Sequence, residues 1–188
     1  MYLCIGKTYY IILEIILVRH TSVDVPRGTC YGQTDVPVAD SFVQEATLTR
    51  QMLQTYAPFD CAYTSPLTRA KQLAAFCGYA DATTDARLME MSMGEWEMMR
   101  YDDISDPRLS EWYDDYMHLP TPGGESFPML HARVSAFLDE LRQKDDRRVV
   151  VFAHGGVLIS AGLYAGLFDE QHAWDHLTPY GGIQYIEI

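Results

Sequence analysis

Short apolar runs alternate along the chain with amphipathic segments. The runs cover residues 14–18, 59–65 and 147–153, and they are rich in β-branched or aromatic side chains, as buried strands are. The segments LTRAKQLAAFC and VLISAGLYAGL, which follow the second and third runs, carry apolar residues at helical spacing. Strands that alternate with helices predict an α/β fold, a three-layer sandwich with a mostly parallel central sheet.

Other segments complete this pattern. Residues 41–56 have a helical composition that stops before Pro58, and residues 126–143 read as an amphipathic helix. The apolar stripe of the latter consists of Leu130, Val134, Phe137, Leu138 and Leu141. We further expect a short extended piece at 83–88, a helix around 109–117 and a final strand within 181–188.

Two local features indicate where function lies. Ser65 is a plausible N-cap and Pro66 suits a first helical position, which would put Arg69 in the first turn of the second helix. Residues 21–40 are rich in Gly, Pro, Asp and Thr, so they predict a long irregular loop. Loops of this length in compact domains are usually functional.

Three strand ends carry cationic or imidazole side chains. Arg19 and His20 end the first run, Arg69 comes just after the second and His154 ends the third. A single histidine at such a place is more often a packed core or boundary residue. Because ligands bind at the carboxyl ends of parallel strands, three such ends together predict one site.

Two arginines, two histidines and no set of metal ligands suit phosphoryl transfer. Guanidinium groups bind phosphate oxygens in pairs, and a neutral imidazole can attack phosphorus and form a covalent intermediate. The reaction also needs a carboxylic acid to protonate the leaving oxygen and then activate water. Glu90, Glu95 and Glu97 are the candidates, and the residues alone do not rank them.

Composition limits the alternatives. A chain of 188 residues suits a single domain spanning 1–188, and a net charge of −12 argues against nucleic-acid polymers and anionic membranes as partners. An anionic substrate would have to be captured locally. Cys4, Cys30, Cys61 and Cys77 lack metal-ligand spacing, so we expect reduced thiols, no metal, no cofactor and a cytoplasmic protein.

The N-terminal residues stand apart from this scheme. Residues 1–13 are apolar, but Lys7 and Glu14 interrupt the run well short of a membrane span, and no signal-peptide pattern is present. Since residues 14–18 already complete a strand, residues 1–13 are an N-terminal extension, a prolongation of the strand or a misassigned start.

Four segments together resemble the histidine phosphatase superfamily, which also contains the cofactor-dependent phosphoglycerate mutases. They are LVRHT, TSPLTRAKQLA, LMEMSMGEWE and VFAHGG, and they occur in the family's order. The resemblance implies a phosphoglycerate mutase-like fold and phosphohistidine chemistry on a small phosphorylated substrate. It makes His20 the nucleophile, assigns Arg19, Arg69 and His154 to the phosphate pocket, and makes Glu90 the proton donor.

Two further segments, RGTCYGQTDVPV and TPGGESF, resemble the alpha-ribazole phosphatase branch of this superfamily. That likeness implies hydrolysis of alpha-ribazole 5′-phosphate in cobalamin biosynthesis. The alternatives are a broad-specificity small-molecule phosphatase, a phosphoglycerate mutase and a catalytically silent phospholigand-binding protein. A homo-oligomer also stays open.

Several residues are candidates for contacts beyond the phosphate. Tyr31, Trp96, Met98 and Met99 are placed to contact a benzimidazole, with core packing as the alternative, which we favour for both methionines. The family often has Gly after the catalytic His and after the Trp-Glu pair, where this chain has Thr21 and Met98. Thr21 would add a hydroxyl donor to a phosphate.

The remaining cationic candidates receive no catalytic role. Arg27 is either a phosphate clamp or a solvated side chain. His172 and His176 lack the Glu of metalloprotease motifs, so we interpret them as surface or packing residues, together with His118 and His131.

Overall fold

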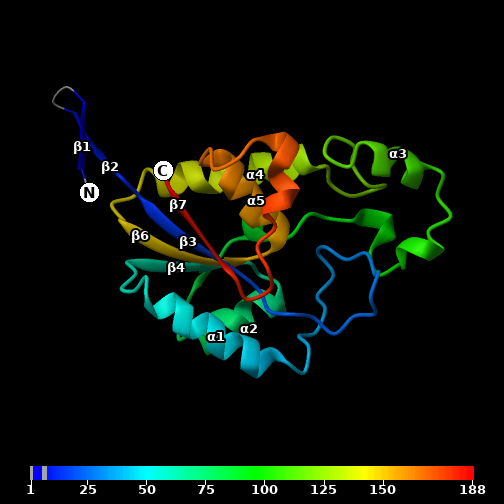
Figure 1. Ribbon diagram of the computed structural model, residues 1–188, viewed down its shortest axis with the longest axis horizontal. Coiled ribbons are helices and arrows are strands. Elements are labelled where there is room, and N and C mark those ends of the chain that lie inside the picture. Colours follow the sequence, from blue (N-terminus) through cyan, green and yellow to red (C-terminus); the bar gives the residue numbers. More distant parts are fainter. Residues whose placement is uncertain (1, 6–7) are drawn as a thin grey trace.

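A five-stranded sheet forms the centre of the protein. The computed structural model describes residues 2–5 and 8–188 (Figure 1). The strand order is β5-β4-β6-β3-β7, where β3 is Glu14–Arg19, β4 Cys61–Thr64, β5 Thr83–Thr84, β6 Arg148–Ala153 and β7 Ile183–Glu187. The first four strands in that order are parallel and β7 is antiparallel to β3. The predicted mostly parallel sheet is confirmed.

Helices cover both faces of this sheet (Figure 1). The pair α1 (Phe42–Gln54) and α2 (Thr68–Phe76) lies on one face, and the pair α4 (Phe127–Leu141) and α5 (Gly155–Tyr164) lies on the other. The three-layer prediction is therefore confirmed. The short helix α3 (Arg108–Asp114) lies to one side, with the 3-10 turns η1 (Ala86–Leu88), η2 (Gly94–Trp96), η3 (Tyr101–Asp103) and η4 (Glu170–His176) completing the chain.

The four inner residues of β3 are all apolar because the strand is buried on both sides. Ile15 and Leu17 join the core under α4 and α5, while Ile16 and Val18 join the core under α1 and α2. Successive side chains of a strand point to opposite faces, so a central strand between two helical layers has no polar face. Each such side chain contributes about 1.5–3 kcal/mol of burial free energy.

The amphipathic pattern of residues 126–143 is also confirmed. All five residues of the predicted stripe are buried in α4. Their rings and branches pack on the α4 face of the sheet, in the same core as Ile15 and Leu17.

Two helix starts differ from the prediction. Helix α2 begins at Thr68 with Leu67 as its N-cap, so Ser65 and Pro66 precede the helix, although Arg69 does lie in its first turn. The Ser65 hydroxyl instead hydrogen-bonds to His154, which follows β6. Helix α5 begins at Gly155, with His154 as its N-cap after β6, which is earlier than the apolar pattern indicates. The extended piece at 83–88 is the two-residue strand β5 followed by η1.

Two N-terminal strands form a sheet of their own. Strands β1 (Tyr2–Ile5) and β2 (Thr8–Ile11) pair antiparallel in their own two-stranded sheet, which projects from the main sheet (Figure 1). Met1, Gly6 and Lys7 lie outside the described residues. Along the part of the chain that is described, no helix has the length and apolar character needed to cross a membrane.

Candidate active site

The carboxyl ends of three adjacent strands meet at one point. In the five-stranded sheet, Arg19 of β3 pairs with Ala153 of β6, and Thr64 of β4 pairs with Phe152 of β6. The residues that follow are His20, His154 and Ser65, so they emerge side by side. The ring centroids of His20 and His154 lie 5.1 Å apart, with 59° between the ring planes. The predicted convergence is therefore present in the structure.

His20 is buried and held in one orientation. Its Nδ1 lies 2.7 Å from the carbonyl oxygen of Thr21. Because a carbonyl can only accept, Nδ1 carries the proton and Nε2 carries the lone pair. Burial, with help from the charge of Arg69, lowers the pKa of His20 to about 3. The ring is therefore neutral near pH 7 and suited to nucleophilic attack through Nε2.

Two guanidinium groups flank this imidazole. Arg19 donates from Nη1 to the carbonyl of Thr178 at 2.6 Å. Arg69 is fully buried and donates to the carbonyls of Gly32 at 2.6 Å and Thr34 at 3.0 Å. Among the described residues neither arginine forms an ion pair with a carboxylate. Their positive charges therefore stay available to an anionic ligand.

His154 hydrogen-bonds to Ser65. Its Nε2 lies 2.7 Å from Ser65 Oγ, which also accepts a bond from the backbone N–H of Leu67 at 3.3 Å. Burial holds the pKa of His154 well below its usual range, so this ring is neutral as well. Its second nitrogen, Nδ1, is buried and has no protein partner in the described chain.

Buried polar atoms without a partner gather at this place. Six side-chain atoms of the described residues are in that state, and four belong to this site: Arg19 Nε, Thr21 Oγ1, Arg69 Nε and His154 Nδ1. The other two are indole nitrogens. Buried polar groups are nearly always hydrogen-bonded, and leaving one unpaired is costly. A group of them around a neutral histidine is the pattern of a site for a ligand rich in acceptor oxygens, and it includes Thr21.

Glu90 is the candidate carboxylate that bonds to the start of α5, two residues after His154. Its Oε2 accepts a bond from the N–H of Gly156, in the first turn of α5, at 3.1 Å, and its Oε1 accepts from the N–H of Met91 at 2.9 Å. A Cβ at Gly156 would lie 2.4 Å from Glu90 Oε1. Glycine is therefore required there for the carboxylate to approach so closely.

The other two candidates are occupied elsewhere. Glu95 keeps 69% of its side chain exposed and lies 3.7 Å from Arg108. Glu97 accepts four backbone N–H bonds, from Gly32, Gln33, Thr34 and Met93. Although burial opposes ionisation, these donors hold its pKa below the usual range. A carboxylate fixed in the ionised form is a poor proton donor, so the geometry favours Glu90.

An ion pair between Arg133 and Glu125 stabilises the segment that carries Glu90. Arg133 of α4 donates to the carbonyls of Arg87, Met89 and Glu90 at 2.6–2.9 Å and pairs with Glu125 at 2.8 Å. Glu125 also accepts from the N–H of Ser92. Sequence reasoning missed this pair, because most contacts of Arg133 are to backbone carbonyls of a distant segment, which no local pattern marks.

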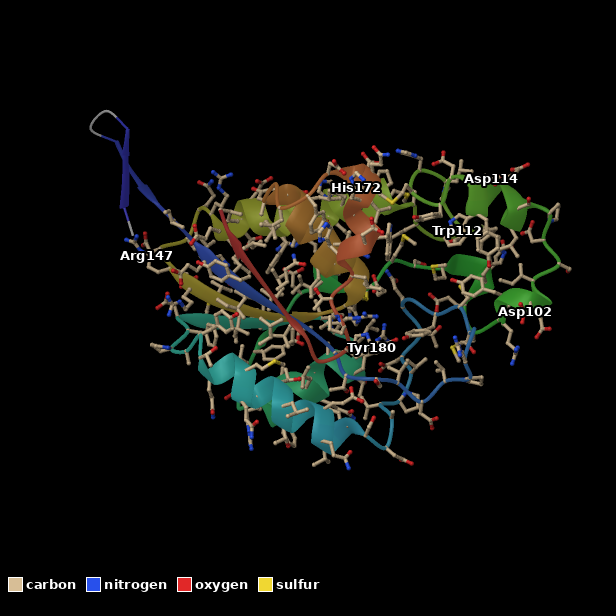
Figure 2. All side chains as sticks on the ribbon, in the orientation of Figure 1. Asp102, Trp112, Asp114, Arg147, His172 and Tyr180 are labelled. Carbon is tan, nitrogen blue, oxygen red and sulfur yellow. The ribbon has the colours of Figure 1, made fainter. Side chains whose placement is uncertain are left out.

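An aromatic cavity opens beside Glu90. It has a volume of about 260 Å³ and is lined by Tyr31, Glu90, Met91, Met93, Tyr101, Trp112, Tyr116 and Trp174. Figure 2 shows Trp112 on the side of α3 that faces the rest of the protein. The lining contains no Lys or Arg, so the cavity suits a planar, apolar group better than a second anion.

Two tyrosines bridge the site. The hydroxyl oxygens of Tyr31 and Tyr180 lie 2.8 Å apart. The guanidinium carbon of Arg19 lies 4.1 Å from the ring centroid of Tyr180, and that of Arg69 lies 5.6 Å from the ring centroid of Tyr31. Tyr180 also lies at the carboxyl end of the strands in Figure 2. No motif singles it out in the sequence, where it stands in an ordinary turn before β7.

The other candidates for ligand contacts are one buried tryptophan and two exposed methionines. Trp96 is buried and packs edge-on against Trp112, so it is a core residue. Met98 and Met99 are 46% and 37% exposed, and the prediction that they are core residues is wrong. Their backbone pairs with Cys30, which holds the loop while both side chains point outward.

The other histidines and Arg27 lie outside the site. His118 contacts Asp115 and Glu170, and His172 contacts Asp169. His131 bonds to Ser160, His176 stacks on Phe168, and Arg27 is exposed. Within the described residues no group of three or more His, Cys, Asp or Glu side chains is placed to hold a metal ion, and Cys30, Cys61 and Cys77 are free thiols.

The chain belongs to the histidine phosphatase superfamily (branch 1), because the model of that family matches residues 15–188. It is 32% identical over 159 residues to phosphoglycerate mutase-like protein 4 of Arabidopsis thaliana, covering 78% of this chain and 68% of that protein. It is 27% identical over 192 residues to glucosyl-3-phosphoglycerate phosphatase of Mycolicibacterium vanbaalenii, covering 93% and 83%.

Solved structures share the fold. One, provisionally described as an alpha-ribazole-5′-P phosphatase of Escherichia coli, superposes with a TM-score of 0.82 over 94% of this chain and 90% of that chain, at 23% identity. Membership of the superfamily makes this protein an enzyme of its phosphatase and mutase class, acting on a small phosphorylated substrate.

Proposed function

We propose that the protein is a metal-independent phosphomonoesterase that works through a phosphohistidine at His20. The observation that carries this proposal is the group of buried, unpartnered polar atoms around the neutral ring of His20. Arg19, Arg69, His154 and Thr21 would bind the equatorial oxygens of the transferring phosphoryl group, where charge is spread in the transition state.

The reaction would take two steps. Nε2 of His20 attacks phosphorus, a P–N bond forms and the P–O bond to the leaving group breaks, while Glu90 in its acid form gives a proton to the departing oxygen. Glu90, now a carboxylate, then takes a proton from water. That water attacks phosphorus, the P–N bond breaks, and inorganic phosphate leaves with His20 and Glu90 restored.

We propose alpha-ribazole 5′-phosphate as the substrate. Glu90 must lie next to the leaving oxygen, so the aromatic cavity beside Glu90 is where the leaving group would bind. Its aromatic and thioether walls match a flat benzimidazole, with Tyr31 among the contacts. The similarity of two loop segments to alpha-ribazole phosphatases supports the same substrate.

The cavity argues against two other substrate classes. Phosphoglycerate carries a carboxylate, and phosphoserine carries both a carboxylate and an ammonium group. No cationic side chain lines the cavity to receive a carboxylate. Phosphoglycerate and phosphoserine are therefore less favoured as substrates than an ester with an aromatic leaving group. This applies to a phosphoglycerate mutase as well as to a phosphatase.

Phosphate release in EDTA tests this proposal. Purified protein is given alpha-ribazole 5′-phosphate, phosphoserine, 3-phosphoglycerate and a simple nucleotide at equal concentrations. We expect hydrolysis without added metal and the highest kcat/KM for the ribazole phosphate. Equal turnover of all four compounds would retain the chemistry and reject the substrate, and activity that requires a metal would reject the chemistry.

A Tyr31→Leu variant sharpens the substrate test. It should raise KM for the ribazole phosphate while changing p-nitrophenyl phosphate hydrolysis much less, because the smaller ester barely enters the cavity. An equal effect on both esters would show that Tyr31 does not select the leaving group.

A further inference from the structure

Glu97 is unusual because its carboxylate is saturated with backbone donors. Oε1 accepts from the N–H of Gln33 at 2.8 Å and of Met93 at 3.0 Å. Oε2 accepts from the N–H of Gly32 at 3.0 Å and of Thr34 at 3.2 Å. Three consecutive residues of the long loop are thus tied to one side chain that lies more than sixty positions further along the chain.

The same loop residues bind Arg69 on their other side. Arg69 donates to the carbonyl of Gly32 at 2.6 Å and to that of Thr34 at 3.0 Å. The carbonyl of Gly32 and the N–H of Gln33 belong to one peptide group, and in a trans peptide these two bonds point in opposite directions. One peptide plane therefore bridges the Glu97 carboxylate and the Arg69 guanidinium.

The loop has no room to shift between these two groups. A Cβ on Gly32 would lie 1.8 Å from the carbonyl oxygen of Met91 and 3.0 Å from Glu97 Oε1. Gln33 adds a bond from Nε2 to the carbonyl of Glu90 at 3.1 Å. The bridging peptide is consequently packed against the segment that carries the candidate acid.

The bridging peptide holds the buried charge of Arg69 without a direct ion pair. A buried arginine needs a counter-charge, but a carboxylate bonded directly to it would neutralise it and compete with phosphate. The single peptide group between Glu97 and Arg69 orients the guanidinium, since hydrogen bonds in a chain polarise one another. The negative charges of Glu90, Asp35 and Glu97 all act on Arg69, and Glu90 contributes most. Arg69 Nε meanwhile has no hydrogen-bond partner among the described residues.

We propose that Glu97 is a positioning residue, which holds Arg69 for phosphate through residues 32–34 and forms no ion pair with it. The inference rests on the proposed function in one respect, namely that Arg69 binds the phosphoryl group. Glu97 would act through the loop, since its carboxylate already accepts four backbone N–H bonds.

Orthovanadate, a mimic of the transferring phosphoryl group, is the probe for this role. In Glu97→Gln the affinity for vanadate should fall by about tenfold, which is a change of about 1.4 kcal/mol. The KM for p-nitrophenyl phosphate should rise with it, while kcat falls less. Glu95→Gln is the matched control, because Glu95 is exposed in the same segment, and its vanadate affinity should stay within about twofold of wild type.

A double-mutant cycle separates positioning from a general structural effect. If Glu97 acts through Arg69, then Glu97→Gln should change vanadate affinity by less than about twofold in an Arg69→Met background. Full additivity of the two substitutions would overturn the inference, and so would unchanged vanadate affinity in Glu97→Gln.

Glu97→Asp tests the role of Glu97 if Glu97→Gln does not fold. Its shorter carboxylate keeps the charge but cannot reach all four donors, so vanadate affinity should lie between that of wild type and the neutral variant. Wild-type affinity in Glu97→Asp would contradict the proposal. Selective loss of vanadate binding in a protein that hydrolyses no ester would support the role of Glu97 and reject the proposed phosphatase function.

Discussion

The rings of His20 and His154 lie 5.1 Å apart, and each uses a different nitrogen to bond to the protein. His20 is held through Nδ1 by the carbonyl of Thr21, whereas His154 is held through Nε2 by the hydroxyl of Ser65. The free nitrogen of the first ring is an electron-pair donor. The free nitrogen of the second is suited to donate a proton in a hydrogen bond, provided that Ser65 sets its tautomer.

Ser65 should place the proton of His154 on Nδ1. Ser65 Oγ already accepts from Leu67, so donation of its own proton to His154 Nε2 satisfies both partners. Nitrogen-15 NMR of the histidine rings should show protonated Nδ1 in His154. In Ser65→Ala we expect a mixed tautomer and vanadate affinity lowered several-fold.

Ser92→Ala is a suitable control for that experiment. Ser92 Oγ accepts from the backbone N–H of Gly94 at 3.4 Å, in the segment that carries Glu90, but contacts neither histidine. It should leave the His154 signals unchanged. A protonated Nε2 in the wild-type protein would contradict the assigned role of Ser65.

Glu90→Gln should reveal the proton donor through the leaving group. The rate for an alkyl phosphate should fall by about 10²–10⁴-fold, because an alkoxide must be protonated as it departs. The rate for p-nitrophenyl phosphate should fall far less, since nitrophenolate leaves without a proton. Steady-state rates on both esters measure this difference.

The same pattern in Glu95→Gln would show that the wrong acid is named. We expect that variant to behave as wild type, because its side chain is exposed and pairs with Arg108.

Burial of neutral His20 predicts loss of stability in acid. Burial lowers its folded-state pKa to about 3, whereas the unfolded chain keeps a pKa near 6.5. Between these values the unfolded state binds a proton that the folded state does not. The contribution is therefore fully present above pH 6.5 and is lost as the pH falls, by up to about 1.4 kcal/mol per pH unit.

Urea unfolding of wild type and His20→Gln between pH 7 and pH 4 tests that slope. The variant should lose less free energy of unfolding per pH unit than wild type. His118→Gln should not share this effect, because Asp115 raises the pKa of exposed His118 and gives its contribution the opposite sign. Equal slopes in wild type and His20→Gln would show that His20 is not buried in the neutral form.

Met98 lies in a backbone conformation that favours glycine. Its φ is +65°, and its side chain is 46% exposed, so little apolar burial is lost on truncation. Met98→Gly should raise the free energy of unfolding by about 1 kcal/mol, measured by thermal or urea unfolding. Met99→Gly is the control and should lower it, because Met99 has no positive φ to relieve. A loss of stability in Met98→Gly equal to that in Met99→Gly would contradict this account.

Elements with a strong local period were predictable. The stripe of α4 and the two-sided burial of β3 follow from the spacing of apolar residues, which tertiary packing then respects. The meeting of His20 with His154 also followed, since parallel strands end at one edge of a sheet.

Features that depend on distant contacts were not predictable. Ser65 looked like a helix cap by its local sequence, but a histidine 89 positions away takes its hydroxyl. Met98 and Met99 are apolar, which favoured the core, whereas backbone pairing with Cys30 turns them outward. Tyr180 and Arg133 contact the site or its backbone from other elements, and no local pattern marks such contacts.

Direct capture of the phosphoenzyme tests the central claim. Protein mixed with substrate is quenched in base, where phosphohistidine survives, and the peptides are mapped by mass spectrometry. We expect phosphate on His20, attached through Nε2, and none in His20→Ala. Phosphate on another residue, or turnover retained in His20→Ala, would contradict the phosphohistidine mechanism.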